Sequence, residues 1–195
     1  LQAVSVGQAK LQATGDKGAV LAGPVDITVE AKIAIPAAST AAGMWVRLFL
    51  AETPSPEASG YSLADAKTSM TWMRAVVENR LRTPSHLWAS KDATSLTDVI
   101  KASGQFEGFA KYPAIASKIQ TRIDETVAIA NDGNDPRRGK YKDFVQAALD
   151  VAGVNRVSDP SEKGLYWWRT AGSGSPTSSA KVYMTKLGNT FYTPK

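Results

Sequence analysis

The chain carries few of the side chains that usually perform chemistry, and the carboxyl group of Glu52 is the best placed of them. The 195 residues of the chain include no cysteine and a single histidine, His86. This composition excludes thiol nucleophiles, cysteine-bound zinc and histidine metal clusters, so carboxyl groups remain as the main acids and bases. Glu52 follows the apolar residues 48–51 and precedes Pro54, where a helix is expected to end.

Two properties of this position favour the protonated form of Glu52. Apolar neighbours exclude water from the carboxyl group, and the negative end of the helix dipole repels its charge. Both effects raise the pKa of a carboxyl group toward the value that a general acid needs. The alternative is a solvated glutamate at a helix end, with no chemical role.

Two other arrangements that resemble catalytic or binding motifs are rejected. A Ser-His-Asp triad would have to use His86, but that residue follows a helix in a loop, and no G-x-S-x-G sequence exists in the chain. Gly172 and Gly174 resemble half of a phosphate-binding loop, but no Gly-Lys-Ser/Thr accompanies them. We therefore expect no nucleotide, no metal and no other cofactor.

The composition is that of a globular protein with a basic surface. Apolar residues make up 43% of the chain, and the net charge is +5. A positive surplus favours anionic partners such as nucleic acid, an acidic membrane surface or an anionic cell-wall polymer. The densest basic run, 137–142, is too short to indicate a nucleic-acid interface by itself. No apolar run approaches the ~20 residues of a membrane-spanning helix, so we expect no membrane span.

Hydrophobic periodicity predicts a mainly helical core. Thr40 is expected to cap a helix that ends before Pro54, and Ser62 to cap a long helix that ends at Leu81. Three more helices are expected at the following positions: a short one after the capping-box pattern of Ser95 and Asp98, one opened by Tyr112-Pro113 and running to residue 130, and one capped by Asp135 with Pro136 in its first turn and ending at Gly153.

Strands are expected at both ends of the chain. Residues 25–29 alternate between apolar and polar side chains, so residues 1–38 are interpreted as a strand-bearing or linker segment. Residues 182–187 and 190–193 flank Gly188-Asn189, which suits a type II′ hairpin turn. The predicted fold class is α+β, mainly helical, with about five helices and a small antiparallel hairpin near the C-terminus.

Several sequence segments, in order, resemble the SleB-like cell wall hydrolases, which include spore-cortex-lytic enzymes. The matching segments are 50–57, 75–81, 103–106, 166–168 and 187–192. The resemblance covers roughly residues 40–193 and implies a lysozyme-like domain at 39–195. It also implies cleavage of peptidoglycan glycan strands between N-acetylmuramic acid and N-acetylglucosamine, by a lytic transglycosylase or a muramidase.

The resemblance places the essential glutamate of that family at Glu52. A single carboxyl group would then protonate the glycosidic oxygen and afterwards accept the proton of the muramyl C6 hydroxyl, which gives a 1,6-anhydro product. An ordinary hydrolase needs a second carboxylate, for which Glu57 and Glu107 are the candidates. Glu57 lies five residues after Glu52 whereas the family's acids are four apart, so its role stays open.

The same resemblance suggests which residues bind the sugar. Gln105 offers amide donors and an acceptor for sugar groups, although it could instead cap a helix end. Thr53 could hydrogen-bond the catalytic carboxyl group or only its own backbone. The aromatic candidates for a sugar-binding platform, or for core packing, are Tyr166, Trp167, Trp168 and Tyr192. Asn79 and Arg80 are expected to have structural roles beside the groove.

The resemblance also sets expectations for location and partners. The resemblance implies action in the bacterial periplasm or cell wall. No signal-peptide pattern is visible in the first residues, so we expect that the chain is delivered by another route or is a processed fragment. A phage lysis protein or an antibacterial effector with a cognate immunity protein fits this pattern. The alternatives are a non-catalytic peptidoglycan-binding module and, more distantly, a basic helical nucleic-acid-binding domain.

Overall fold

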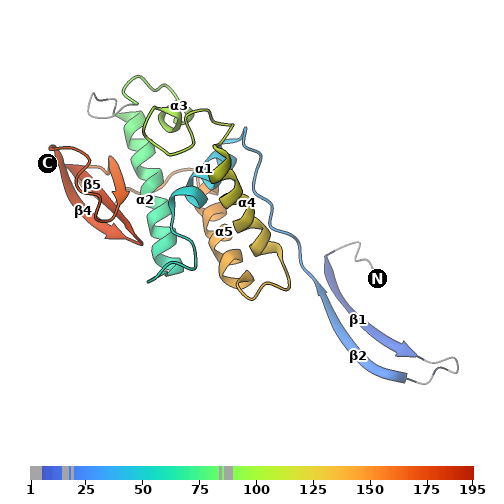
Figure 1. The fold of residues 1–195 in the computed structure, drawn as a ribbon. Helices are drawn as coiled ribbons and strands as arrows, with labels where there is room; N and C mark the ends of the chain where they lie inside the picture. The colour runs from blue at the N-terminus through green and yellow to red at the C-terminus, as the bar shows by residue number, and fades with distance from the viewer. Residues whose placement is uncertain (1–5, 15–17, 19, 84, 86–89) are drawn as a thin grey trace. The chain divides into compact units, whose positions relative to one another are not determined.

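The computed structural model describes residues 6–14, 18, 20–83, 85 and 90–195, and it divides the chain into two compact units (Figure 1). His86 lies outside the described residues. The units are Leu1–Lys32 and Ile33–Lys195. Ile33 belongs to the larger unit because it packs against its core, and its backbone N–H and C=O both bond the side chain of Asn131, at 2.8 and 2.9 Å.

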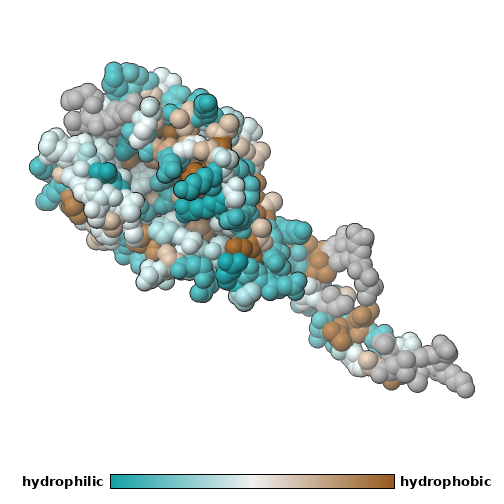
Figure 2. Space-filling model, viewed as in Figure 1, coloured by the Kyte–Doolittle hydropathy of each residue, from teal (hydrophilic) through white to brown (hydrophobic). Residues whose placement is uncertain are grey.

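The small unit is a two-stranded antiparallel sheet of β1 (Gly7–Thr14) and β2 (Val20–Val29). Leu11 pairs with Val25, and both side chains are exposed. Apolar colour is visible on this unit in Figure 2. A two-stranded sheet has no second layer to bury such residues against, so little apolar area is removed from water here.

The larger unit contains five helices among its described residues, which confirms the predicted number. They are α1 (Ala41–Glu52), α2 (Leu63–Arg82), α3 (Leu96–Lys101), α4 (Ser117–Asn131) and α5 (Arg138–Gly153). Three of the four predicted capping residues act as expected, because the side-chain oxygens of Thr40, Ser62 and Ser95 each accept a bond from the backbone N–H three residues later.

Two helices begin later than predicted. Residues 113–116 are not helical, because Ala116 donates its N–H to the carbonyl of Gly108 and closes a loop before α4. Asp135 does not cap α5. Its carboxylate instead accepts bonds from the backbone N–H of Arg137, at 2.8 Å, and from the guanidinium of the same residue. This local turn occupies residues 135–137 and delays the start of α5 to Arg138.

The C-terminal strands form a three-stranded sheet and not the isolated hairpin predicted. Its members are β3 (Trp167–Thr170), β4 (Ala180–Lys186) and β5 (Asn189–Pro194), in the antiparallel order β3-β5-β4. The turn between β4 and β5 lies at Leu187-Gly188, one residue earlier than predicted. Both turn residues have positive φ, 40° and 72°, which is typical of a type I′ turn and not of type II′.

The core of the larger unit lies around α1, which contacts α2, α4 and α5 (Figure 1). Nearly all of α1 is buried, so this helix has no broad solvent face. The sheet packs on the opposite side of α2, where the Trp72 ring meets Tyr183 and Phe191 edge-on, at centroid distances of 5.5 and 5.2 Å. No described helix combines the length and the apolar character needed to span a membrane.

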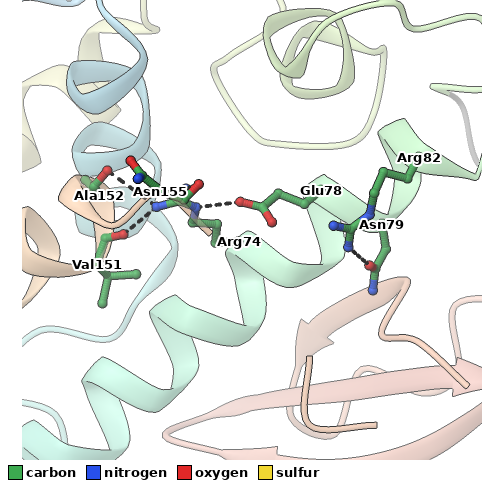
Figure 3. Close-up of polar contacts among 7 residues, drawn as sticks. All are labelled: Arg74, Glu78, Asn79, Arg82, Val151, Ala152 and Asn155. Atoms are coloured by element: carbon green, nitrogen blue, oxygen red, sulfur yellow. Dashed lines mark hydrogen bonds and ion pairs between the residues drawn. The ribbon is translucent and has the colours of Figure 1, made fainter. Parts of the chain in front are cut away.

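Polar side chains of α2 hold the segment that leads from α5 to β3. Arg74 is buried and donates to the carbonyls of Val151, at 2.7 Å, and Asn155, at 3.1 Å, while it pairs with Glu78 at 2.7 Å (Figure 3). One helical turn later, Asn79 donates to the carbonyl of Leu165 at 2.9 Å. Residues 151–165 are therefore fixed along α2, and this segment positions β3.

Candidate functional site

A pocket of about 800 Å³ lies where the end of α1 meets the C-terminal sheet. It is open to solvent on one side and is large enough for sugar units of a polysaccharide. Its walls come from the end of α1, from α2, α4, β3 and β5, and from the loops around residues 104–107 and 171–177. Five of the residues predicted as site residues line it together, namely Glu52, Gln105, Glu107, Trp167 and Trp168.

Glu52 is placed in the pocket because the end of α1 is fixed by two side chains from distant parts of the sequence. The Asn189 amide donates to the carbonyl of Glu52 at 3.3 Å, and the Arg122 guanidinium donates to the carbonyl of Thr53 at 2.9 Å. The last carbonyls of a helix have no partner within the helix, so these bonds satisfy groups that would otherwise need water. Both donors also line the pocket.

The carboxyl group of Glu52 has the electrostatic character of a general acid. Burial raises its pKa from 4.5 to about 7. A hydrogen bond from the Trp168 side chain and the charge of Arg122 lower this pKa, but burial outweighs both, and the charge of Glu107 raises the pKa further. The carboxyl group therefore keeps its proton at pH values where an ordinary glutamate is ionised, which suits proton donation.

Gln105 and Arg80 form a polar pair in the pocket wall. Arg80 is buried, and its guanidinium donates to the Gln105 side-chain oxygen and to the carbonyl of Tyr166 at 2.7 Å. This bond orients Gln105 through its oxygen, and its two amide N–H donors have no partner in the part of the chain that the structure describes. Arg80 therefore has a structural role, as predicted, but it also lines the pocket.

Neighbouring tryptophans of β3 contribute differently to the pocket. Trp168 is partly buried, stacks on Phe106 at 5.0 Å and bonds the Glu52 carboxyl group. Trp167 lines the pocket but is only 4% exposed, because it packs with Tyr192 and Ala180 in a small second cluster. Trp168 thus contacts the Glu52 carboxyl group directly, while Trp167 serves mainly as packing.

Three predicted sugar-binding residues do not line the pocket. The Thr53 side chain is fully buried, with its hydroxyl directed at the Met73 sulfur 3.8 Å away. Tyr192 is buried, and its hydroxyl donates to the carbonyl of Gly174 at 3.0 Å. Tyr166 accepts from Arg80 through its backbone and packs on Trp167. All three support the walls and have no surface in the pocket.

Of the two candidate second acids, only Glu107 reaches the pocket. Glu107 lines it and raises the pKa of Glu52 through its charge. Glu57 is exposed, is not among the lining residues, and instead interacts with Arg137. The described residues contain no group of three or more His, Cys, Asp or Glu side chains placed to hold a metal ion.

The sequence interpretation missed two arginines in the pocket wall. Arg122 lies next to the apolar face of α4, one residue before the buried Ile123, and Arg169 follows the two tryptophans on β3. A cation beside an apolar helix face is a weak signal of a pocket. Nothing in the sequence of α4 indicates that this face meets the end of α1.

Comparisons with protein-family models, with curated proteins and with solved structures found no match to this chain. Glu52 lies in the pocket and also within the first of the sequence segments that resemble SleB-like hydrolases.

The raised pKa of Glu52 predicts a specific pH dependence of stability. The folded state holds the Glu52 proton more tightly than the unfolded state does. The protonated carboxyl group therefore contributes stability that is fully present below about pH 4.5 and is lost as the pH rises through about 7. Between pH 4 and pH 8, we expect the wild type to lose about 3 kcal/mol of unfolding free energy relative to Glu52→Gln. Urea denaturation at several pH values measures this shift.

The matched control is Glu57→Gln, because Glu57 is an exposed glutamate away from the pocket. Its stability curve should run parallel to that of the wild type across the same pH range. Parallel curves for Glu52→Gln and wild type would contradict the burial of the Glu52 carboxyl group.

Proposed function

We propose that this chain cleaves the glycan strands of peptidoglycan between N-acetylmuramic acid and N-acetylglucosamine, with Glu52 as the general acid. The observation that carries the proposal is a carboxyl group with a pKa of about 7 in an open pocket of about 800 Å³ beside a tryptophan. The resemblance of five sequence segments to SleB-like hydrolases supports the same residue. We further infer that the helical unit has a lysozyme-like core.

The first chemical step is proton donation from Glu52 to the glycosidic oxygen, which breaks the bond to the leaving sugar. Trp168 donates a hydrogen bond to the carboxyl group and orients it toward the pocket. The stacking of Trp168 on Phe106 in turn fixes the indole ring. The developing negative charge on Glu52 is stabilised by the guanidinium of Arg122, whose charge lowers the pKa of Glu52.

Two routes complete the reaction, and they differ in the role of Glu107. In a lytic transglycosylase, the Glu52 carboxylate takes the proton of the muramyl C6 hydroxyl, and the hydroxyl oxygen closes a 1,6-anhydro ring. In a hydrolase, a second carboxylate activates water or forms a glycosyl intermediate. Glu107 is the second carboxylate in the pocket wall, so it replaces Glu57 as the candidate for this role.

Mass spectrometry of the fragments released from purified peptidoglycan sacculi tests the proposal. We expect glycan fragments that end in muramic acid, because the bond on its C1 side is the one cleaved. Anhydro ends indicate the transglycosylase route, and reducing ends indicate hydrolysis. Intact strands after long incubation with the wild-type chain would contradict the cleavage and leave a peptidoglycan-binding module as the interpretation.

A further inference from the structure

Three guanidinium groups line the pocket around Glu52. Arg80 comes from α2, Arg122 from α4 and Arg169 from β3, so the fold brings together cations that are far apart in the sequence. Their recorded hydrogen bonds go to neutral oxygens: Arg80 binds a carbonyl and the Gln105 amide, Arg122 binds the carbonyl of Thr53, and Arg169 binds that of Ser175 at 3.4 Å.

These three arginines have no carboxylate at ion-pair distance within the described part of the chain. Arg74, the other buried arginine of α2, does have such a partner in Glu78. A buried cation without a counter-charge is costly, and burial lowers the pKa of Arg80 to about 10, which still leaves it charged at neutral pH. The pocket therefore retains positive charge that the protein does not neutralise.

The two carboxyl groups of the pocket do not balance this charge. Burial raises the pKa of Glu52 to about 7, so this carboxyl group does not supply a full negative charge at neutral pH. Glu107 supplies one carboxylate against three guanidinium groups. An occupant with a negative charge fits this surplus better than a neutral sugar chain does.

We propose that the pocket binds its glycan through a carboxylate group, which is held by Arg169 with Arg122 beside it. This inference rests on the proposed function. Guanidinium groups present paired N–H donors that match the two oxygens of a carboxylate. Arg169 is exposed, and among the described residues it makes one long hydrogen bond, 3.4 Å to the carbonyl of Ser175. Most of its donors are therefore available to a ligand, while Arg122 also holds the end of α1.

Peptidoglycan offers such a carboxylate in two places. The lactyl group of muramic acid ends in a free carboxylate when the peptide stem has been removed. When the stem is present, the lactyl group is an amide and the carboxylates lie on the stem. A neutral polymer of N-acetylglucosamine has neither, so the subsite would distinguish peptidoglycan from chitin.

Binding of three disaccharide probes tests the proposal. The probes are N-acetylglucosaminyl-N-acetylmuramic acid with a free lactyl carboxylate, its lactyl carboxamide, and the same disaccharide with a peptide stem. None contains the bond that the chain is proposed to cleave, so the wild type can be used. Titrations followed by the indole N–H resonances of Trp167 and Trp168 report binding within the pocket.

We expect at least one carboxylate probe to bind the wild type about ten-fold more tightly than the neutral carboxamide, as hydrogen bonds to a charged group imply. If the probe with the free lactyl acid binds more tightly, the bound carboxylate is that of the lactyl group. If only the stem-bearing probe binds more tightly, the bound carboxylate lies on the peptide stem. Arg169→Gln should reduce the preference toward equal binding. Arg156→Gln, which changes an exposed arginine that does not line the pocket, should keep it.

Equal affinity of all three probes for the wild type would overturn the carboxylate subsite, and so would an unchanged preference in Arg169→Gln. Release of fragments from sacculi is measured in parallel with the same wild-type protein. Fragment release without a carboxylate preference leaves the cleavage intact and removes the subsite. A carboxylate preference without fragment release supports the subsite and contradicts the cleavage.

Discussion

Glu52→Gln is expected to lower the rate of peptidoglycan lysis by about 10²–10⁴-fold, the range that a general acid typically contributes. Glutamine keeps the shape of the side chain and can still accept the hydrogen bond from Trp168, but it has no carboxylic proton to donate. The variant should also fold, because it replaces a partly buried carboxyl group with a neutral group of the same size. Release of dye-labelled fragments from sacculi measures the rate.

Two further glutamate variants act as controls for this result. Glu57→Gln should lyse sacculi like the wild type, because Glu57 lies outside the pocket. Glu107→Gln should retain activity if Glu52 alone serves as acid and base, and should lose most of it if the chain is a hydrolase that uses Glu107 as its second carboxylate. Undiminished lysis by Glu52→Gln would remove Glu52 as the general acid.

The helices that surround the candidate site were largely predictable from local patterns. The capping residues Thr40 and Ser62 and the apolar spacing that follows them predict α1 and α2, because caps and one-sided burial are properties of a few neighbouring residues. The same local reasoning places Glu52 at the end of a buried helix. It predicts a raised pKa for Glu52 if the carboxyl group is buried, with a solvated glutamate as the alternative, and the structure has the buried form.

The rest of the pocket depends on contacts that no local pattern contains. Arg122 reaches the end of α1 from a helix 69 residues further along the chain, and Asn189 does so from the last strand. Glu57 is close to Glu52 in sequence but leaves the pocket once the chain turns after Pro54, whereas Glu107 arrives through the loop after α3. Sequence proximity therefore does not predict which glutamate lies with Glu52 in the pocket.

The roles of Trp167 and Trp168 are likewise not predictable from local sequence. Alternation along a strand predicts that neighbouring side chains point to opposite faces, but it does not say which face meets the acid. The answer depends on β3 pairing with β5, which places Trp168 opposite Phe191 and Trp167 opposite Tyr192. Trp168 can then pack between Phe106 and Phe191 and reach Glu52, while Trp167 faces the smaller cluster.

The position of β3 depends in turn on the segment that α2 holds, and Arg74 is its most buried anchor. Figure 3 shows its guanidinium directed at the carbonyls of Val151, Ala152 and Asn155, at the end of α5. The same group pairs with Glu78 and lies over the Trp45 ring at 5.3 Å. The Arg74 side chain therefore binds the last carbonyls of α5, pairs with a carboxylate and packs on an aromatic ring.

Arg74→Met is expected to lower the free energy of unfolding by about 3–5 kcal/mol, because it leaves a mostly buried carboxylate without its partner. Adding Glu78→Met should recover only part of this loss, since the carbonyls at the end of α5 remain without a donor. Lys67→Met is the control, because the Lys67–Asp150 pair is exposed and contributes little. Urea denaturation compares the variants. If Arg74→Met were no less stable than Lys67→Met, the Arg74 network would not anchor the segment that carries β3 and its two tryptophans to the pocket.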